Sequence, residues 1–167
     1  MKLQDVLERV ESSKTFEYWK KDNEGSYLSS FFKIVEAEDK NWWQLDFYNP
    51  KKDKMTSFVA EKEIKLVGKD SKIFKREHDK VEELILEKVY VDAKKAVQIC
   101  LDLLKDKYDN AKVTKKIVIL QNVQSIIWNI SLLTPTLKLL NVRIDADSGA
   151  VLEDSYKNML EFRSQSE

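Results

Sequence analysis

The chain is poor in the residues from which most catalytic and metal sites are built. Its 167 residues include one cysteine, one histidine, three glycines and two prolines. A single cysteine excludes an internal disulfide framework, and a single histidine excludes most zinc sites. Three glycines leave no room for a glycine-rich loop that would cradle a phosphate. We therefore expect no metal, no cofactor and no catalytic residues, and the protein is predicted not to be an enzyme.

An excess of one charge and long apolar runs are also missing. The 29 basic and 29 acidic side chains cancel, whereas a dedicated nucleic-acid binder normally carries a basic excess. No apolar run approaches the roughly 18 residues that a membrane-spanning helix needs. The start, Met1–Val6, is amphipathic and does not resemble a secretion signal. These absences predict a cytoplasmic protein that binds neither nucleic acid nor membranes.

The composition is nevertheless that of a folded protein. Apolar residues make up 43% and aromatic residues 10% of the chain, which is enough for a packed core. Segment 51–80 is locally rich in lysine. A solvated surface of strands and loops explains this enrichment, and a groove for an acidic partner is the alternative.

An internal duplication organises the sequence. Both prolines follow a tryptophan by seven residues, in the segments Trp43–Pro50 and Trp128–Pro135, which lie 85 positions apart. In both segments large apolar side chains alternate with polar ones up to the proline, as in a half-buried strand that ends there. The repetition predicts one structural unit used twice.

The flanking segments extend each unit to a helix followed by three strands. The expected strands are 27–35, 43–48 and 55–66 in the first unit, and 116–120, 128–133 and 138–146 in the second. An apolar stripe begins the first unit at Leu3, and Asp92 is the predicted N-cap of a second helix that ends near Tyr108. Helical spacing also predicts a connecting helix and a short closing helix that includes Tyr156 and Leu160.

The predicted fold class is α+β, with two tandem helix–β-meander (αβββ) units and antiparallel sheet. The first unit spans 1–76, the connecting helix 77–90, and the second unit 91–167. Whether the two sheets join edge to edge or pack face to face stays open. Each unit alone offers a small core, so we expect the two units to pack on each other.

A stretch near the C-terminus resembles a known family. Val142–Leu152 contains an apolar strand, an Asp–Ala pair, Ser148 with Gly149, and a Val–Leu exit. With the preceding helix and strands, residues 91–154 resemble a PepSY domain, and the first unit resembles a second copy without this motif. The resemblance implies a cystatin-like α+β module that is often found in tandem. It also implies a role in protein interaction or in restraining peptidases, without catalytic residues.

Trp42 is the basis of the predicted binding site. It precedes the inward-facing Trp43, so it should lie on the polar face of its strand with Gln44, Asp46 and Tyr48. Such a patch is typical of a surface that binds a protein, a peptide or a second copy of the chain. Coverage by a loop or by the other unit is the alternative.

The predicted function is therefore a non-enzymatic interaction or regulatory module, with β-strand addition at a free sheet edge as its natural mode. Two other functions stay open: a small-ligand-binding protein or enzyme with a cleft between the repeats, and a structural protein that self-associates.

Other reactive side chains have simpler explanations. His78 lies among charged residues and is predicted to be exposed, and Cys100 lies on the apolar stripe of its helix. Asp145 and Asp147 resemble the start of a calcium loop, but Gly149 and Tyr156 stand where that loop needs oxygen ligands. A turn between two short strands is the better interpretation.

Overall fold

The computed structural model describes residues 1–72 and 80–161, which form helices on an antiparallel sheet. The helices are α1 (Leu3–Glu11), α2 (Lys14–Lys21) and α3 (Ala93–Leu103), with a short 3₁₀ turn at Leu86–Lys88 and a π-helical turn at Leu104–Tyr108. The first four strands are β1 (Tyr27–Val35), β2 (Trp43–Asn49), β3 (Lys54–Ala60) and β4 (Ile64–Ser71). The last four are β5 (Lys115–Val123), β6 (Ser125–Leu133), β7 (Lys138–Asp145) and β8 (Val151–Asn158).

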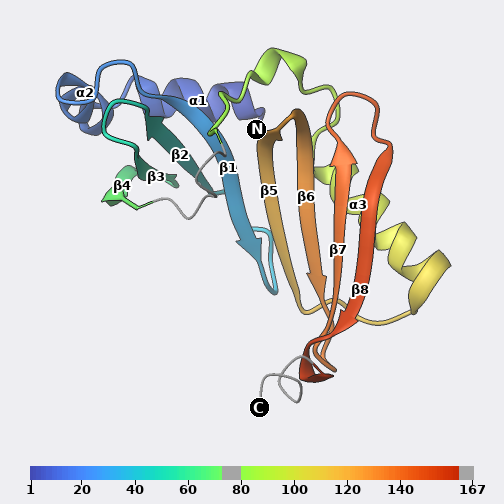
Figure 1. The fold of residues 1–167 in the computed structure, drawn as a ribbon. Coiled ribbons are helices and arrows are strands. Elements are labelled where there is room, and N and C mark those ends of the chain that lie inside the picture. The colour runs from blue at the N-terminus through green and yellow to red at the C-terminus, as the bar shows by residue number, and fades with distance from the viewer. Residues whose placement is uncertain (73–79, 162–167) are drawn as a thin grey trace.

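All eight strands belong to one sheet, in the order β4-β3-β2-β1-β5-β6-β7-β8. The N-terminal half supplies β1–β4 and the C-terminal half supplies β5–β8. The first strand of each half lies in the centre, where β1 and β5 pair antiparallel from Ser30↔Gln121 to Val35↔Lys116. The question of how the two sheets meet is thus answered: they join edge to edge (Figure 1).

Each half contains four strands rather than the three that were predicted. The segment expected as one strand at 55–66 is a hairpin, because β3 ends at Ala60 and β4 begins at Ile64. The turn consists of Glu61, Lys62 and Glu63, which include none of the glycine, proline or asparagine that marks most turns. In the C-terminal half, β8 continues to Asn158, and among the described residues of the predicted closing helix only 159–161 are helical.

The predicted connecting helix at 77–90 is also absent where it can be judged. Residues 80–85 are not helical, and only Leu86–Lys88 form a 3₁₀ turn. This segment instead pairs with the sheet: the Leu84 amide donates to the Leu28 carbonyl at 2.8 Å. Leu84 is 4% exposed, and burial of its side chain stabilises the segment in this non-helical conformation. Residues 77–79, and His78 with them, lie outside the described residues.

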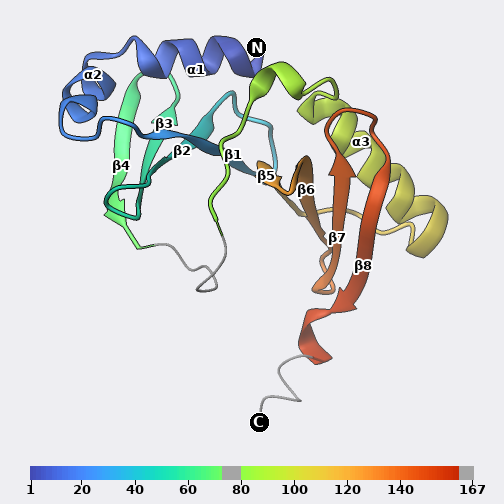
Figure 2. The ribbon, with the colours of Figure 1, turned by 45° about the horizontal axis from the view of Figure 1, so that its top comes forward.

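Helix α3 begins at its predicted cap, and the first unit has a second helix, α2, that was not predicted. The Asp92 carboxylate accepts a hydrogen bond from the Lys95 amide at 2.7 Å, and Ser13 caps α2 in the same way through the Phe16 amide. These caps satisfy backbone donors that a helix start leaves unpaired. Helices α1, α2 and α3 pack against β3, β4 and β6 respectively (Figure 2).

The helices of both halves cover one face of the sheet and share a single core. Val6 and Val10 of α1 belong to the same buried cluster as Ala96 and Cys100 of α3. The remaining members of the cluster come mainly from alternate positions of β1–β3 and β5–β7. The halves therefore pack as one body.

The two repeated tryptophans meet inside this core. Trp43 and Trp128 are 6% and 0% exposed, and their ring centroids lie 6.4 Å apart. The Trp128 indole donates to the Val91 carbonyl at 2.8 Å. Trp43 is contacted by the ammonium of buried Lys33, which lies 4.6 Å from the ring centroid and 2.6 Å from the Asp39 carboxylate.

Candidate interaction face

The face of the sheet opposite the helices carries an apolar strip along its centre. Strand β1 places Phe32 and Ile34 on this face, directly opposite Ile119 and Ile117 of β5. All four side chains are half-buried, and none of them belongs to the core cluster. We call this side of the sheet the open face and these four residues the central strip.

Polar side chains flank the central strip on the N-terminal half. Asp46 of β2 accepts hydrogen bonds from Ser30 at 2.8 Å, Gln44 at 2.9 Å and Ser57 at 2.6 Å. The three donors come from β1, β2 and β3, so the carboxylate ties together three strands. Gln44 lies directly opposite Phe32. The strip is therefore bordered on this side by an ordered, hydrogen-bonded group.

A second polar group borders the strip on the C-terminal half. The Asn141 amide donates to Asn129 at 2.7 Å and to Ser131 at 2.9 Å. Asn129 and Ser131 lie opposite Ile119 and Ile117. They also lie 85 positions after Gln44 and Asp46. The open face thus has an apolar centre and a polar border on both sides, which is the usual anatomy of a protein–protein interface.

The structure separates the four residues that were predicted to bind a partner. Gln44 and Asp46 lie together on the open face, as described above. Tyr48 is on the same face but only 6% exposed, because its ring packs edge-on against Tyr27 at 5.6 Å and its hydroxyl donates to Asp53 at 2.5 Å. The expectation of an exposed Tyr48 ring is therefore wrong. The cause is tertiary contact, which strand alternation does not register.

Trp42 lies apart from these residues. It precedes β2, its amide donates to the Lys40 carbonyl at 2.8 Å, and it is half-buried. The hollow that it lines includes Arg9 and Lys65 but none of Gln44, Asp46 and Tyr48. The expectation that Trp42 lies in the strand beside Gln44 and Asp46 is therefore wrong, because β2 begins only at Trp43 and Trp42 belongs to the loop before it.

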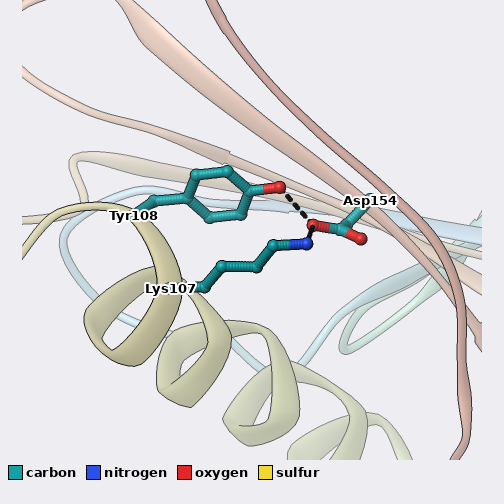
Figure 3. Close-up of polar contacts among 3 residues, drawn as sticks. All are labelled: Lys107, Tyr108 and Asp154. Carbon is teal, nitrogen blue, oxygen red and sulfur yellow. Dashed lines mark hydrogen bonds and ion pairs between the residues drawn. The ribbon is translucent and has the colours of Figure 1, made fainter.

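A group of titratable side chains in direct contact joins the end of α3 to β8 in the C-terminal half. The Tyr108 hydroxyl donates to Asp154, and the Lys107 ammonium lies 2.9 Å from the same oxygen (Figure 3). The hydrogen bond from Tyr108 is the main cause that holds the pKa of Asp154 below its ordinary value, and the bond from Lys107 adds to it. The bond between Tyr108 and Asp154 also raises the pKa of Tyr108. Tyr108 also stacks on Tyr156 at 5.0 Å.

This cluster fastens the edge strand to the helix that covers it. Lys107 and Tyr108 lie in the π-helical turn that ends α3, and Asp154 is on the inward side of β8, next to Val142 of β7. Tyr108 and Asp154 are 46 positions apart in the sequence, with no spacing pattern that would predict their contact. Sequence reasoning missed this group for that reason.

The remaining candidates have structural roles. Cys100 is fully buried, and burial raises its pKa to about 12, so the thiol stays protonated. Asp145 accepts hydrogen bonds from the Asp147 and Ser148 amides at 2.9 and 2.8 Å, and these lower its pKa. The predicted turn before β8 is confirmed, with Gly149 at φ +79°. Within 1–72 and 80–161, no group of three or more His, Cys, Asp or Glu side chains is placed to hold a metal ion.

Among the residues that the structure describes, no helix is both long and apolar enough to cross a bilayer. No known family model matches the sequence, and no curated protein resembles it significantly. The fold resembles the crystal structure of a protein from Clostridium difficile 630 that is described as a candidate lipoprotein. The two share 14% sequence identity at a TM-score of 0.52, over 86% of this chain and 90% of that one. That likeness shows an α+β fold with an antiparallel sheet.

Proposed function

We propose that this protein is a non-enzymatic interaction or regulatory module that binds a protein or peptide partner through its open face. The observation that carries the proposal is the central strip: four half-buried apolar side chains on the two middle strands, with no helix from residues 1–72 or 80–161 over them. An antiparallel sheet that faces only water normally presents polar side chains there. A partner with a complementary apolar surface would remove this strip from water.

We further propose that the module is built from two PepSY-like repeats. The strand order, which runs outward from β1 in one half and from β5 in the other, supports a duplication. So do the two tryptophans, each on the second strand of its half. The cytoplasmic location stays a prediction, since the similar solved structure is that of a candidate lipoprotein.

The test makes the strip more polar and keeps the branching at Cβ. Ile34→Thr with Ile117→Thr keeps β-branched side chains in a directly opposed pair and replaces one methyl-bearing arm by a hydroxyl. Val67→Thr, at a 54% exposed position of β4, is the matched control. We expect wild type and the control to retain a partner from native lysate, or to self-associate in sedimentation, and the double variant to lose that binding.

Two results would contradict the proposal. One is a set of captured proteins that is the same for wild type and the double variant. The other is a wild-type protein that stays monomeric in sedimentation while every protein it captures is also captured by the double variant. Circular dichroism of each variant establishes that the comparison is between folded proteins.

One observation favours a small-ligand-binding protein as the second candidate. A mostly apolar groove of about 420 Å³ lies between the start of α1 and the segment that leads into α3, and Leu3, Leu86 and Val89 are among the residues that line it. This volume is within the range of small-molecule sites. A thermal-shift screen tests it: a ligand that stabilises the wild type but not Val89→Trp, which fills the groove, would favour this function over the open face.

A further inference from the structure

A second surface, distinct from the central strip, surrounds Trp42. It is a hollow of about 820 Å³ at the end of the sheet where β2 begins and β3 turns into β4. Its walls come from α1, the loop between β1 and β2, the β3–β4 turn and the first residues of β4, which contribute Arg9, Trp42 and Lys65 among others. We call it the Trp42 hollow.

Trp42 is the one tryptophan of the chain with a partly accessible ring. The other three, Trp19, Trp43 and Trp128, are 4%, 6% and 0% exposed, whereas Trp42 is half-buried at the rim of the hollow. A tryptophan in this position offers a large, rigid contact surface, and tryptophan is enriched among the residues that dominate binding energy.

The charge of the hollow is predominantly positive. Arg9, Lys40, Lys62 and Lys65 line it, against the two carboxylates of the turn at 61–63. Within the described part of the chain none of these four cations has an ion-pair partner within 4.0 Å.

Two backbone carbonyls of the β3–β4 turn hold the Arg9 guanidinium in place. It donates to the Glu61 carbonyl at 2.6 Å and to the Lys62 carbonyl at 3.4 Å. The arginine thus fixes the turn to α1, and the lysines around it keep their charge available to a ligand.

A free sheet edge adjoins the hollow. Strand β4 is at one end of the sheet, so within the described residues no strand neighbours its far side. Its first residues, Ile64, Lys65 and Leu66, pair in regular register with Ala60, Val59 and Phe58 of β3. Regular pairing on one side leaves the other side able to bond an added strand.

We propose that the Trp42 hollow and the start of β4 bind an extended, acidic peptide segment of a partner protein. The peptide backbone would add to β4, its carboxylates would lie near Lys62 and Lys65, and one of its side chains would cover the Trp42 indole. Charge complementarity selects the acidic class of partner, and the free edge selects an extended peptide. The inference goes beyond the function proposed for the open face, because the Trp42 hollow includes none of the four residues of the central strip.

The test uses three synthetic octapeptides that alternate alanine with glutamate, glutamine or lysine. Trp42 is the partly accessible fluorophore, so a bound peptide is expected to shift its emission. Labelled peptides followed by anisotropy give the affinity independently of the tryptophan. We expect the glutamate peptide alone to bind, with an affinity that falls as salt is added.

Variants assign the binding to the hollow. Lys62→Glu with Lys65→Glu is expected to weaken binding at least about tenfold, a change of ~1.4 kcal/mol. Trp42→Phe should weaken it and remove the emission shift. Lys94→Glu with Lys95→Glu, at two exposed sites on α3, is the charge-matched control and should bind as the wild type does. Ile34→Thr with Ile117→Thr should also bind normally, which separates this surface from the open face.

Four results would overturn the inference. They are equal binding of the glutamate and glutamine peptides, no binding of the glutamate peptide, equal weakening by the control Lys94→Glu with Lys95→Glu, and preferential binding of single-stranded DNA or anionic vesicles over the glutamate peptide.

Discussion

The contact between Trp43 and Trp128 predicts that the two halves of the sheet are energetically coupled. The rings lie 6.4 Å apart at their centroids and are almost fully buried. An aromatic pair in such contact contributes about 0.5–1.5 kcal/mol beyond the area it buries. A double-mutant cycle between these residues should therefore give an interaction free energy in that range.

Leucine is the suitable replacement for both tryptophans. Replacement of a buried tryptophan by alanine costs about 3–5 kcal/mol, and two such losses approach the ~5–15 kcal/mol that stabilise a typical domain. We expect Trp128→Leu to destabilise more than Trp43→Leu. The reason is that its indole donates to the Val91 carbonyl at 2.8 Å, and an unpaired buried carbonyl costs about 1–3 kcal/mol.

The measurement is equilibrium unfolding in urea, followed by far-ultraviolet circular dichroism because both substitutions change the fluorescence. A control cycle combines Trp43→Leu with Val142→Ala on β7, four strand spacings or about 19 Å away in the sheet. The control pair should be additive. Additivity of the tryptophan pair within about 0.3–0.5 kcal/mol, or two separate unfolding transitions, would refute the shared core.

Three further predictions concern single sites. Cys100, with its pKa raised to about 12 by burial, should not react with a thiol reagent at neutral pH until the protein unfolds; fast labelling of the native protein would contradict its placement. Gly149→Ala should destabilise by about 1–2 kcal/mol in urea unfolding, since its φ of +79° disfavours a side chain, and Gly68→Ala, without a positive φ, should cost less. Asp154→Asn should lower the melting temperature at neutral pH, because the wild-type carboxylate has a pKa held below 3.8, chiefly by the Tyr108 hydroxyl. That stabilisation is complete above 3.8 and lost as the pH falls through the lower, folded-state pKa, so the difference between wild type and variant should shrink in acid; a constant difference would argue against the ionised group.

Periodicity and caps predicted the elements that have one buried face. Tyr27–Val35 forms β1 within the predicted bounds, and Asp92 caps α3. Side chains that alternate or repeat every three to four residues report directly which face is buried. The hairpin at Glu61–Glu63 was missed because charged residues, rather than turn residues, connect its strands.

The candidate surfaces depended on information that the sequence carries only in part. Alternation placed Gln44 and Asp46 on one face, but the partners of Asp46 come from three strands whose register is set by pairing. Tyr48 follows the same alternation and is nonetheless buried against Tyr27. The central strip arises from the β1–β5 pairing, which joins residues more than 80 positions apart and has no local signal.

The position of β1 in the middle of the sheet has a consequence during synthesis. Its partner β5 begins at Lys115, 80 residues after β1 ends at Val35, so a ribosome working at about 5–20 residues per second needs roughly 4–16 s to deliver it. Throughout that interval the edge of β1 that later pairs with β5 has no partner strand from its own chain, and β1 is rich in aromatic residues. Two chains synthesised close together could pair β1 of one chain with β5 of the other. The product would be a domain-swapped dimer that uses the same β1–β5 contacts as the monomer.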